Sequence, residues 1–177
     1  MRFFKKHIKE DEDSVKHNEG KPRYAPPEKI PKIFLQPPLI FGIFLVLTML
    51  INQFFPLKLD INFSSLFGVI LGIFGIFINM WSMNKFRKYK TSSHVKHQAF
   101  KLIDEGPYRY SRNPLYLGTA FMIFGFGLAF DLVWVLIGNA FAIVIIHYFV
   151  VLPEENYLIE IFGDKYIMYM KKVRRWI

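Results

Sequence analysis

The sequence alternates between long apolar runs without charge and shorter segments that carry the charged residues. The charge-free runs cover residues 33–57, 61–84, 113–130 and 132–153. Even the shortest, with 18 residues, gives a helix of roughly 27 Å, close to the hydrocarbon thickness of a bilayer. We therefore predict an all-α, polytopic membrane helical bundle of about four transmembrane helices, over residues 33–55, 61–83, 114–130 and 132–152. Within the second span, close approach of another helix is predicted at Gly68, Gly72 and Gly75.

The two ends of the chain have patterns of their own. Residues 1–32 mix both signs of charge with four prolines, which predicts a flexible cytoplasmic arm before a membrane domain over 33–177. Apolar residues recur at helical spacing over residues 158–177, with basic residues on the other faces. This predicts an amphipathic C-terminal helix, with Gly163 as a stop and Asp164 as a fresh N-cap. Two roles stay open for it, an electrostatic anchor on the membrane surface or a lid over the bundle.

Composition and charge placement narrow the class of protein. With 53% hydrophobic and 18% aromatic residues, a soluble domain of 177 residues has too small a core to bury its apolar surface. The net charge of +9 does not indicate nucleic-acid binding, because the 23 Lys and Arg flank the apolar runs. Their counts alternate as nine, one, eight, zero and five, which predicts that both termini and residues 84–112 are cytoplasmic. Without cysteine there is no thiolate metal site, and we expect no metal.

Two polar clusters lie where the third span begins and the fourth ends. They are GPYRYSRNPLYLG at 106–118 and HYFVVLPEENYL at 147–158. Asn113 and Pro114 predict a helix start, with an N-cap followed by proline at the first helical position. Because the two spans are predicted to form a hairpin, Asn113 and Glu154 are expected at the same membrane depth.

Ionisable residues of the second cluster are candidates for function. His147 precedes Glu154 by seven residues, which predicts one helical face, and such residues inside a membrane indicate a functional site. The alternative stays open that Glu154 and Glu155 only pair with Arg109 or Arg112 at the interface.

These clusters, together with EENYLIEIFGDKYIMYMKKVRRWI at 154–177, resemble the isoprenylcysteine carboxyl methyltransferase and phospholipid methyltransferase group of membrane enzymes. The resemblance covers residues 85–177, which we take as the catalytic half. It implies a small helical bundle that uses S-adenosylmethionine (AdoMet). The residues expected to bind this cofactor are Leu102, Ile103, Tyr108, Asn113, Pro114, Leu115, Tyr116 and Glu155. Glu154 is expected nearer the methyl acceptor, and the residues expected to serve catalysis are Glu154, Arg112 and His147.

The chemistry of these residues fits the cofactor. An Asn-Pro helix start offers free backbone N–H groups to the carboxylate of AdoMet, and Glu154 can take its ammonium group. The adenine ring or the sulfonium can face Tyr108, Tyr116 or Tyr166. No G-x-G-x-x-G follows a predicted strand, which excludes a soluble Rossmann-type methyltransferase.

Two departures from the group bear on the acceptor. Asn113 stands where many relatives have His, and Val150–Pro153 fill a stretch where relatives often carry Arg. Both changes weaken any transfer of the prenylcysteine substrate. We therefore predict AdoMet-dependent methylation of a lipid-like or otherwise hydrophobic acceptor at the cytoplasmic face, within membrane lipids. The alternatives are a phospholipid N-methyltransferase and a non-catalytic protein that retains the fold.

Overall fold

The computed structural model describes residues 36–59, 64–90 and 102–177, and every regular element in these ranges is helical. In chain order the elements are α2 (Pro37–Phe54), α3 (Ser64–Lys90), η1 (Gly106–Arg109), α4 (Pro114–Ala129), α5 (Val133–Ile146), η2 (His147–Val151), α6 (Leu152–Phe162) and α7 (Asp164–Lys172). Among these, η1 is a 3₁₀ helix and η2 is a π-helix. The predicted all-α membrane bundle is confirmed, whereas the arm predicted over residues 1–32 lies outside the described residues.

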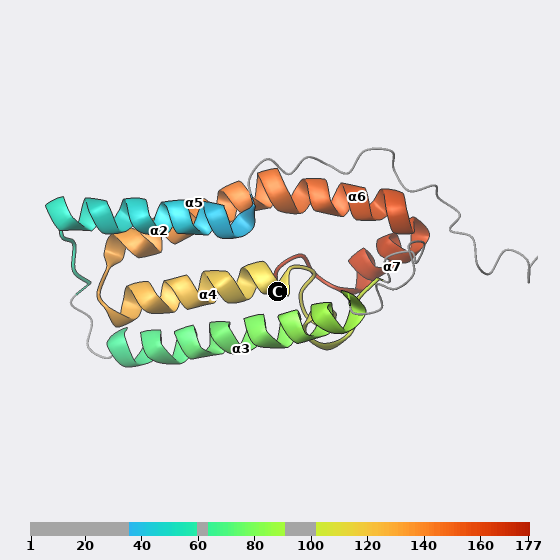
Figure 1. Cartoon of the computed structure of the whole chain (residues 1–177), viewed down its shortest axis with the longest axis horizontal. Helices are drawn as coiled ribbons and strands as arrows, with labels where there is room; N and C mark the ends of the chain where they lie inside the picture. The colour runs from blue at the N-terminus through green and yellow to red at the C-terminus, as the bar shows by residue number, and fades with distance from the viewer. Residues whose placement is uncertain (1–35, 60–63, 91–101) are drawn as a thin grey trace, which may run out of the picture.

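The long helices lie antiparallel, with α2 against α5 and α3 against α4 (Figure 1). Proline sets the start of both α2 and α4, where its missing N–H removes no helical hydrogen bond. Among the described residues, three stretches are long and apolar enough to cross a membrane, Pro37–Phe54, Ser64–Lys85 and Val133–Phe162. The fourth predicted span corresponds to α4, a shorter apolar helix of 16 residues. Crossing by four spans therefore stays a prediction.

Two helices continue past the ends that the charge pattern predicts. α3 runs to Lys90 instead of Met83, because charged residues end a membrane span without ending a helix. α5, η2 and α6 form one rod of 30 residues that ends at Phe162, ten residues beyond the predicted end of the last span. At about 45 Å this rod exceeds the hydrocarbon thickness, so part of α6 extends beyond the lipid.

The C-terminal segment departs from its predicted helix. Gly163, with φ at 54°, ends α6 in a conformation that favours glycine. Asp164 is then the first residue of α7, and no side chain caps that helix, so the predicted Asp164 cap is wrong. The amphipathic helix ends at Lys172, because Val173 is already extended (φ −121°, ψ 130°).

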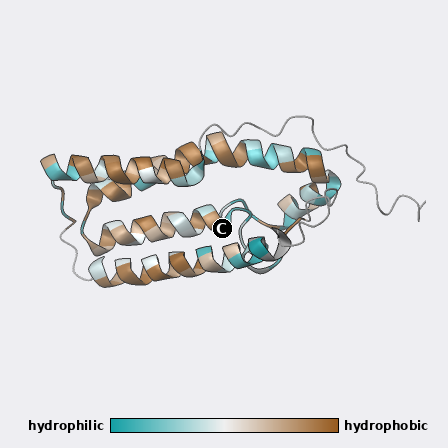
Figure 2. Cartoon of the chain, viewed as in Figure 1, coloured by the Kyte–Doolittle hydropathy of each residue, from teal (hydrophilic) through white to brown (hydrophobic). Residues whose placement is uncertain are grey.

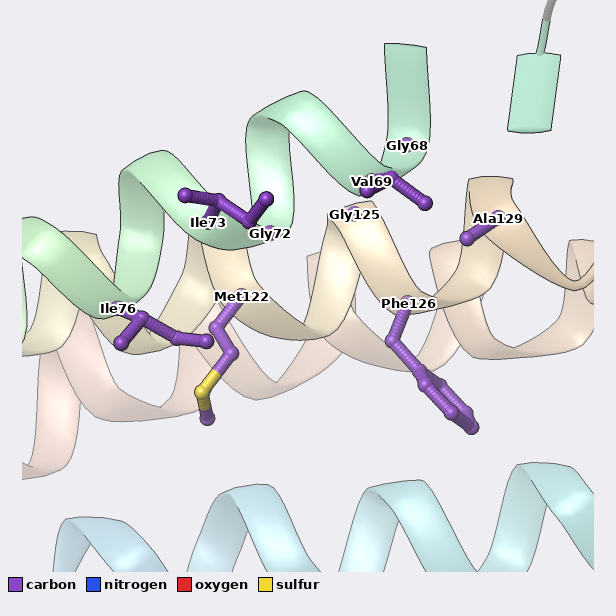
Figure 3. Close-up of a pocket in the computed structure, with 9 residues that line it drawn as sticks. All are labelled: Gly68, Val69, Gly72, Ile73, Ile76, Met122, Gly125, Phe126 and Ala129. Carbon is purple, nitrogen blue, oxygen red and sulfur yellow. The ribbon is translucent and has the colours of Figure 1, made fainter. Parts of the chain in front are cut away.

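Glycine brings α3 and α4 together. A Cβ atom added to Gly75 would lie 2.5 Å from the backbone N of Met122 and 2.6 Å from the backbone O of Gly118. A Cβ on Gly125 would lie 2.5 Å from the backbone O of Gly68. The predicted close-packing face is confirmed. Along this contact lies an apolar groove of about 220 Å³, lined by residues of both helices (Figure 3).

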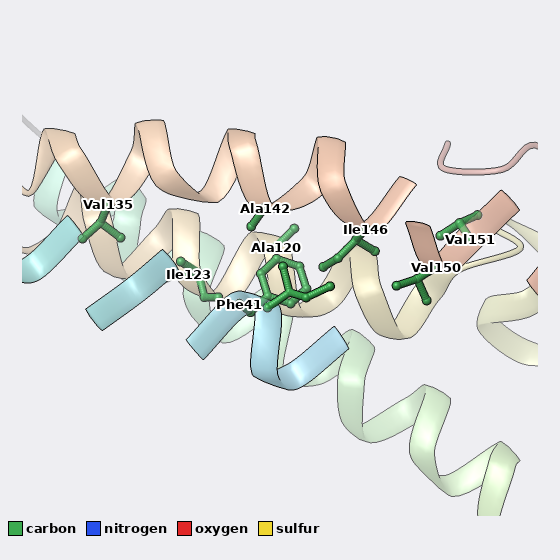
Figure 4. Close-up of a cluster of buried hydrophobic side chains, with 9 residues drawn as sticks. Phe41, Ala120, Ile123, Val135, Ala142, Ile146, Val150 and Val151 are labelled. Atoms are coloured by element: carbon green, nitrogen blue, oxygen red, sulfur yellow. The ribbon is translucent and has the colours of Figure 1, made fainter. Parts of the chain in front are cut away.

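The buried core lies between α2, α4 and the α5–η2 rod (Figure 4). Phe41 of α2 packs with Ala120 of α4 and with Ala142 and Ile146 of α5. Large apolar side chains elsewhere on these helices stay exposed, as expected for a surface that faces lipid. Hydrophilic residues gather instead at one end, around α6 and α7 (Figure 2). We call this end, made of residues 102–116, 147–155 and 164–177, the polar end.

The opposite end, which we call the turn end, joins residues 55–59 to residues 130–134. The N–H of Leu59 donates to Oδ1 of Asp131 at 2.8 Å, and the indole N–H of Trp134 donates to the carbonyl of Phe55 at 2.7 Å. Asp131 has φ at 57°, the left-handed conformation that Asp tolerates better than most residues. These two bonds tie the loop after α2 to the α4–α5 turn.

Candidate active site

The two polar clusters meet at Tyr116 and Glu154. The Tyr116 hydroxyl, one turn into α4, donates to Oε1 of Glu154 at 3.0 Å and lies 3.2 Å from Oε2. The hairpin of α4 and the α5–α6 rod brings these residues together from positions 38 apart in the chain. Within the described ranges, no Lys, Arg or His forms an ion pair with Glu154. Among the residues that the structure describes, its carboxylate therefore has a hydroxyl donor and no cationic partner.

Glu155 is paired, in contrast, with two arginines. Arg175 donates from Nη2 to Oε2 at 2.8 Å and from Nε at 3.1 Å, and Arg112 Nη1 lies 3.1 Å from Oε1. The Glu155 side chain is only 5% exposed, so both charges offset its loss of water. The alternative of a simple interfacial ion pair thus describes Glu155 with Arg112 and does not describe Glu154. Arg109 is exposed and pairs with neither glutamate in the described part of the chain.

The π-helix changes which residues share a face. The sequence predicts His147 and Glu154 on one face, but Arg175 contacts His147 and Glu155 together, with Nη1 3.5 Å from Nε2 of the imidazole. A π-helix closes i→i+5 hydrogen bonds, so one additional residue is needed to complete the turn. Eight residues instead of seven therefore separate positions on the same side, and the predicted His147–Glu154 face is wrong.

His147 contacts two residues of the C-terminal segment. The indole N–H of Trp176 donates to Nδ1 at 3.3 Å, on the other side of the ring from the Arg175 guanidinium. The imidazole thus contacts the C-terminal segment, while the Tyr116 hydroxyl is held by Glu154. A catalytic role for His147 stays a prediction, and its contacts indicate that it holds the C-terminal segment.

Asn113 stands at the predicted N-cap position of α4, but its side chain does not cap the helix. Its Nδ2 donates to the carbonyl of Arg175 at 3.2 Å, and its backbone N–H donates to the hydroxyl of Ser111 at 3.1 Å. The expected capping bond is therefore wrong. The first turn of α4 begins with Pro114, which is buried, and with Leu115 and Tyr116, which are half-buried and whose N–H groups receive no side-chain cap.

Tyrosines from η1 and α7 lie beside these charged residues and form one wall of the site. Burial, and next the charge of Glu154, raise the pKa of Tyr108 to about 12. The Tyr169 hydroxyl donates to the carbonyl of Tyr108 at 2.7 Å, which fixes η1 against α7. Burial likewise raises the pKa of Tyr166 to about 12, with Glu155 adding to the rise and Arg112 opposing it. Both phenols are therefore neutral at physiological pH.

Other predicted cofactor residues lie around this wall. Leu102 packs against the buried cluster of Tyr166, Tyr169 and Val173, and Ile103 beside it is half-buried. The structure thus assembles most of the predicted residues at the polar end. The sequence reasoning missed Ser111, Tyr169, Arg175 and Trp176, which all take part in hydrogen bonds there. The adjacent Arg174, Arg175 and Trp176 were the only signal, and they fitted an amphipathic surface helix equally well.

The fold and the site define a helical membrane protein whose charged residues converge at one end of the bundle. The family model described as phospholipid methyltransferase matches residues 63–165, more than half of the chain. The chain therefore belongs to the phospholipid methyltransferase family, and the resemblance read from the motifs is confirmed. Membership implies a membrane methyltransferase. The match includes both polar clusters and ends before Arg175. No curated protein matches the chain.

Proposed function

We propose that this protein transfers a methyl group from AdoMet to a lipid-like acceptor at the cytoplasmic face of the membrane. The observation that carries the proposal is the Glu154 carboxylate, which is held by Tyr116 and has no cationic partner among the described residues. A carboxylate near a membrane is costly without a positive partner, and AdoMet brings both an ammonium and a sulfonium. The family description makes phospholipids the first class of acceptor to test.

The residues present fit AdoMet at both of its charged ends. Glu154 offers the negative charge. For the carboxylate of AdoMet, the uncapped start of α4 offers N–H groups and a positive dipole end. Arg112 adds a guanidinium whose side chain is only 8% exposed and whose Nη1 forms an ion pair with Glu155. Among the described residues, its Nε and Nη1 have no partner in a well-aligned hydrogen bond. Tyr108, which is half-buried, supplies aromatic surface for the adenine ring.

The protein contributes to the reaction by positioning the cofactor and by excluding water from it. When bound, AdoMet would supply an electrophilic methyl group, which a nucleophilic atom of the acceptor attacks in line while S-adenosylhomocysteine leaves as the neutral thioether. Glu154, oriented by the Tyr116 hydroxyl, fixes the positive end of the cofactor, and the neutral Tyr108 and Tyr166 narrow the access of water. An acceptor anchored in lipid reaches this end from the membrane, because the helices that surround the site expose apolar side chains along their length.

Binding is the first test. We expect the purified protein in detergent to bind AdoMet and its product S-adenosylhomocysteine (AdoHcy) in the micromolar range, about −8 kcal/mol, by calorimetric titration. Incubation with methyl-labelled AdoMet and a total lipid extract should then label a lipid, which chromatography assigns to a phospholipid class or to another lipid. Absence of heat and of thermal stabilisation at millimolar AdoHcy would refute the proposal. Binding without any labelled lipid would favour a non-catalytic protein.

A further inference from the structure

The last five residues form a strap that returns from α7 to the start of α4. We define the C-terminal strap as residues 173–177, whose end lies beside the beginning of α4 in Figure 1. The carbonyl of Arg174 accepts from the backbone N–H of Arg112 at 3.0 Å. The carbonyl of Arg175 accepts from the Ser111 hydroxyl and from Nδ2 of Asn113, both at 3.2 Å. The strap therefore binds the residues that immediately precede α4.

The side chain of Arg175 connects the strap to the other half of the site. Its guanidinium donates to both oxygens of buried Glu155 and reaches His147 at 3.5 Å. Arg175 thus contacts the loop before α4 through its backbone, and η2 and α6 through its side chain. In the described structure, Glu155 has Arg112 as its other arginine partner.

We propose that Arg175 is a positioning residue of the methyl-transfer site, an inference that rests on the proposed function. It acts in two ways. The ion pair with Glu155 fixes the rotation of α6, and the adjacent Glu154 is thereby aimed at Tyr116. The carbonyl of Arg175 draws the amide of Asn113 toward the strap, which leaves the first turn of α4 uncapped and available to an anion.

The same geometry predicts what removing the guanidinium does. Without Arg175, Arg112 is the one described cation that offsets the charge of Glu155, so the Arg112 guanidinium is drawn fully to that carboxylate. Arg112 is then lost to the carboxylate end of AdoMet, and α6 is free to rotate Glu154 away from Tyr116. Both changes weaken cofactor binding more than they slow the reaction of a bound cofactor. The expected signature is a rise in KM for AdoMet with a smaller change in kcat.

The test compares Arg175→Gln and Arg175→Lys with Arg174→Gln in the full chain. Arg174 is the matched control, because its side chain is exposed and only its carbonyl, which the substitution keeps, contacts the loop. We expect Arg175→Gln to raise Kd for AdoHcy and KM for AdoMet at least tenfold, while kcat at saturating AdoMet falls less than threefold. Arg175→Lys, which keeps the charge but not the two-pronged contact, should recover part of the affinity. Arg174→Gln should match the wild type.

A double-mutant cycle tests the route through Glu155. If Arg175 acts through this carboxylate, adding Glu155→Gln to Arg175→Gln should weaken AdoHcy binding no further than the single change does. Equal AdoHcy affinity in the Arg175→Gln, Arg175→Lys and Arg174→Gln proteins would overturn the positioning role while the proposed function stands. Failure of the wild type and Arg174→Gln to bind AdoHcy would instead overturn the proposed function, and the positioning role with it. Should Arg175→Gln not fold, Arg175→Lys carries the comparison alone.

Discussion

The two ends of the bundle are closed in different ways. At the turn end, two hydrogen bonds between a side chain and a backbone atom connect the loops: the Leu59 N–H donates to Oδ1 of Asp131, and the Trp134 indole N–H donates to the carbonyl of Phe55. At the polar end, Glu155 is held by two arginines and Glu154 by a tyrosine, in a network of charged side chains. The two hydrogen bonds of the turn end are sufficient to close a helical hairpin, so closure does not require the charged network of the polar end. The additional buried charge at the polar end is costly near a membrane, and this cost supports the proposal that the cofactor binds there.

The largest expected contrast between the two ends is their side of the membrane. The chain contains no cysteine, so single Lys58→Cys and Lys172→Cys variants give one label site each, and both positions are exposed. From the alternation of Lys and Arg counts, we expect an impermeant maleimide on intact cells to label the Lys58→Cys protein and leave the Lys172→Cys protein unlabelled. Permeabilised cells provide the control, in which both variants react. Labelling of Lys172→Cys from outside would reverse the orientation and remove access to cytoplasmic AdoMet.

The next largest effect separates function from packing at the polar end. Glu154→Gln keeps the size of the side chain and an acceptor for Tyr116 but removes the charge. We expect turnover to fall at least about 100-fold, roughly 2.7 kcal/mol of transition-state stabilisation, at a nearly unchanged melting temperature. Glu160→Gln, on the exposed side of the same helix, is the matched control and should behave as wild type. A Glu154→Gln protein that melts early yet turns over normally per folded molecule would make Glu154 a structural residue.

The two ends also differ in how far the sequence predicts them. Charge-free runs and the Asn-Pro start predict the helices of the bundle, and the glycines of α3 predict its close contact with α4. These features depend on local rules, in which spacing and proline position determine the result. The predicted site residues do assemble, with Tyr116 on Glu154 and Arg112 on Glu155. A hairpin between adjacent spans is sufficient for that outcome.

What the sequence does not predict depends on tertiary contacts. Residues His147–Val151 are apolar on nearly all sides, so no periodicity distinguishes a π-helix from an α-helix there, and the eight-residue spacing of His147 and Glu155 passes unnoticed. The sequence does not predict the strap for the same reason, since Val173 and Ile177 fit a helix as well as an extended segment. Asn113 shows the same competition, because the strap takes the side chain that local rules assign to the cap.

The third largest effect is expected on stability, from glycine substitutions in the helices between the two ends. At Gly75 a Cβ would meet the backbone of Met122 at 2.5 Å and of Gly118 at 2.6 Å, and backbone atoms cannot move aside. We expect Gly75→Ala to cost about 3 kcal/mol of the free energy of unfolding, measured by SDS titration from mixed micelles. Gly42→Ala, where nothing lies within 4 Å of the added atom, is the control and should leave stability unchanged or raise it slightly. Turnover per folded molecule should stay at the wild-type value in both, since neither residue lies at the polar end.

The smallest effect tests whether the turn end only closes the bundle. Asp131→Ala removes the acceptor of the Leu59 N–H and places alanine at φ 57°, where its Cβ is strained. We expect a loss of about 1–2 kcal/mol in the free energy of unfolding and no change in KM for AdoMet. Asp131→Asn keeps a side-chain oxygen and tolerates the left-handed conformation, so it should stay within about 0.5 kcal/mol of wild type. If Asp131→Ala instead raised KM for AdoMet while Asp131→Asn did not, the two ends would be coupled through the α4 and α5 rods, and the division between a closing end and a binding end would fail.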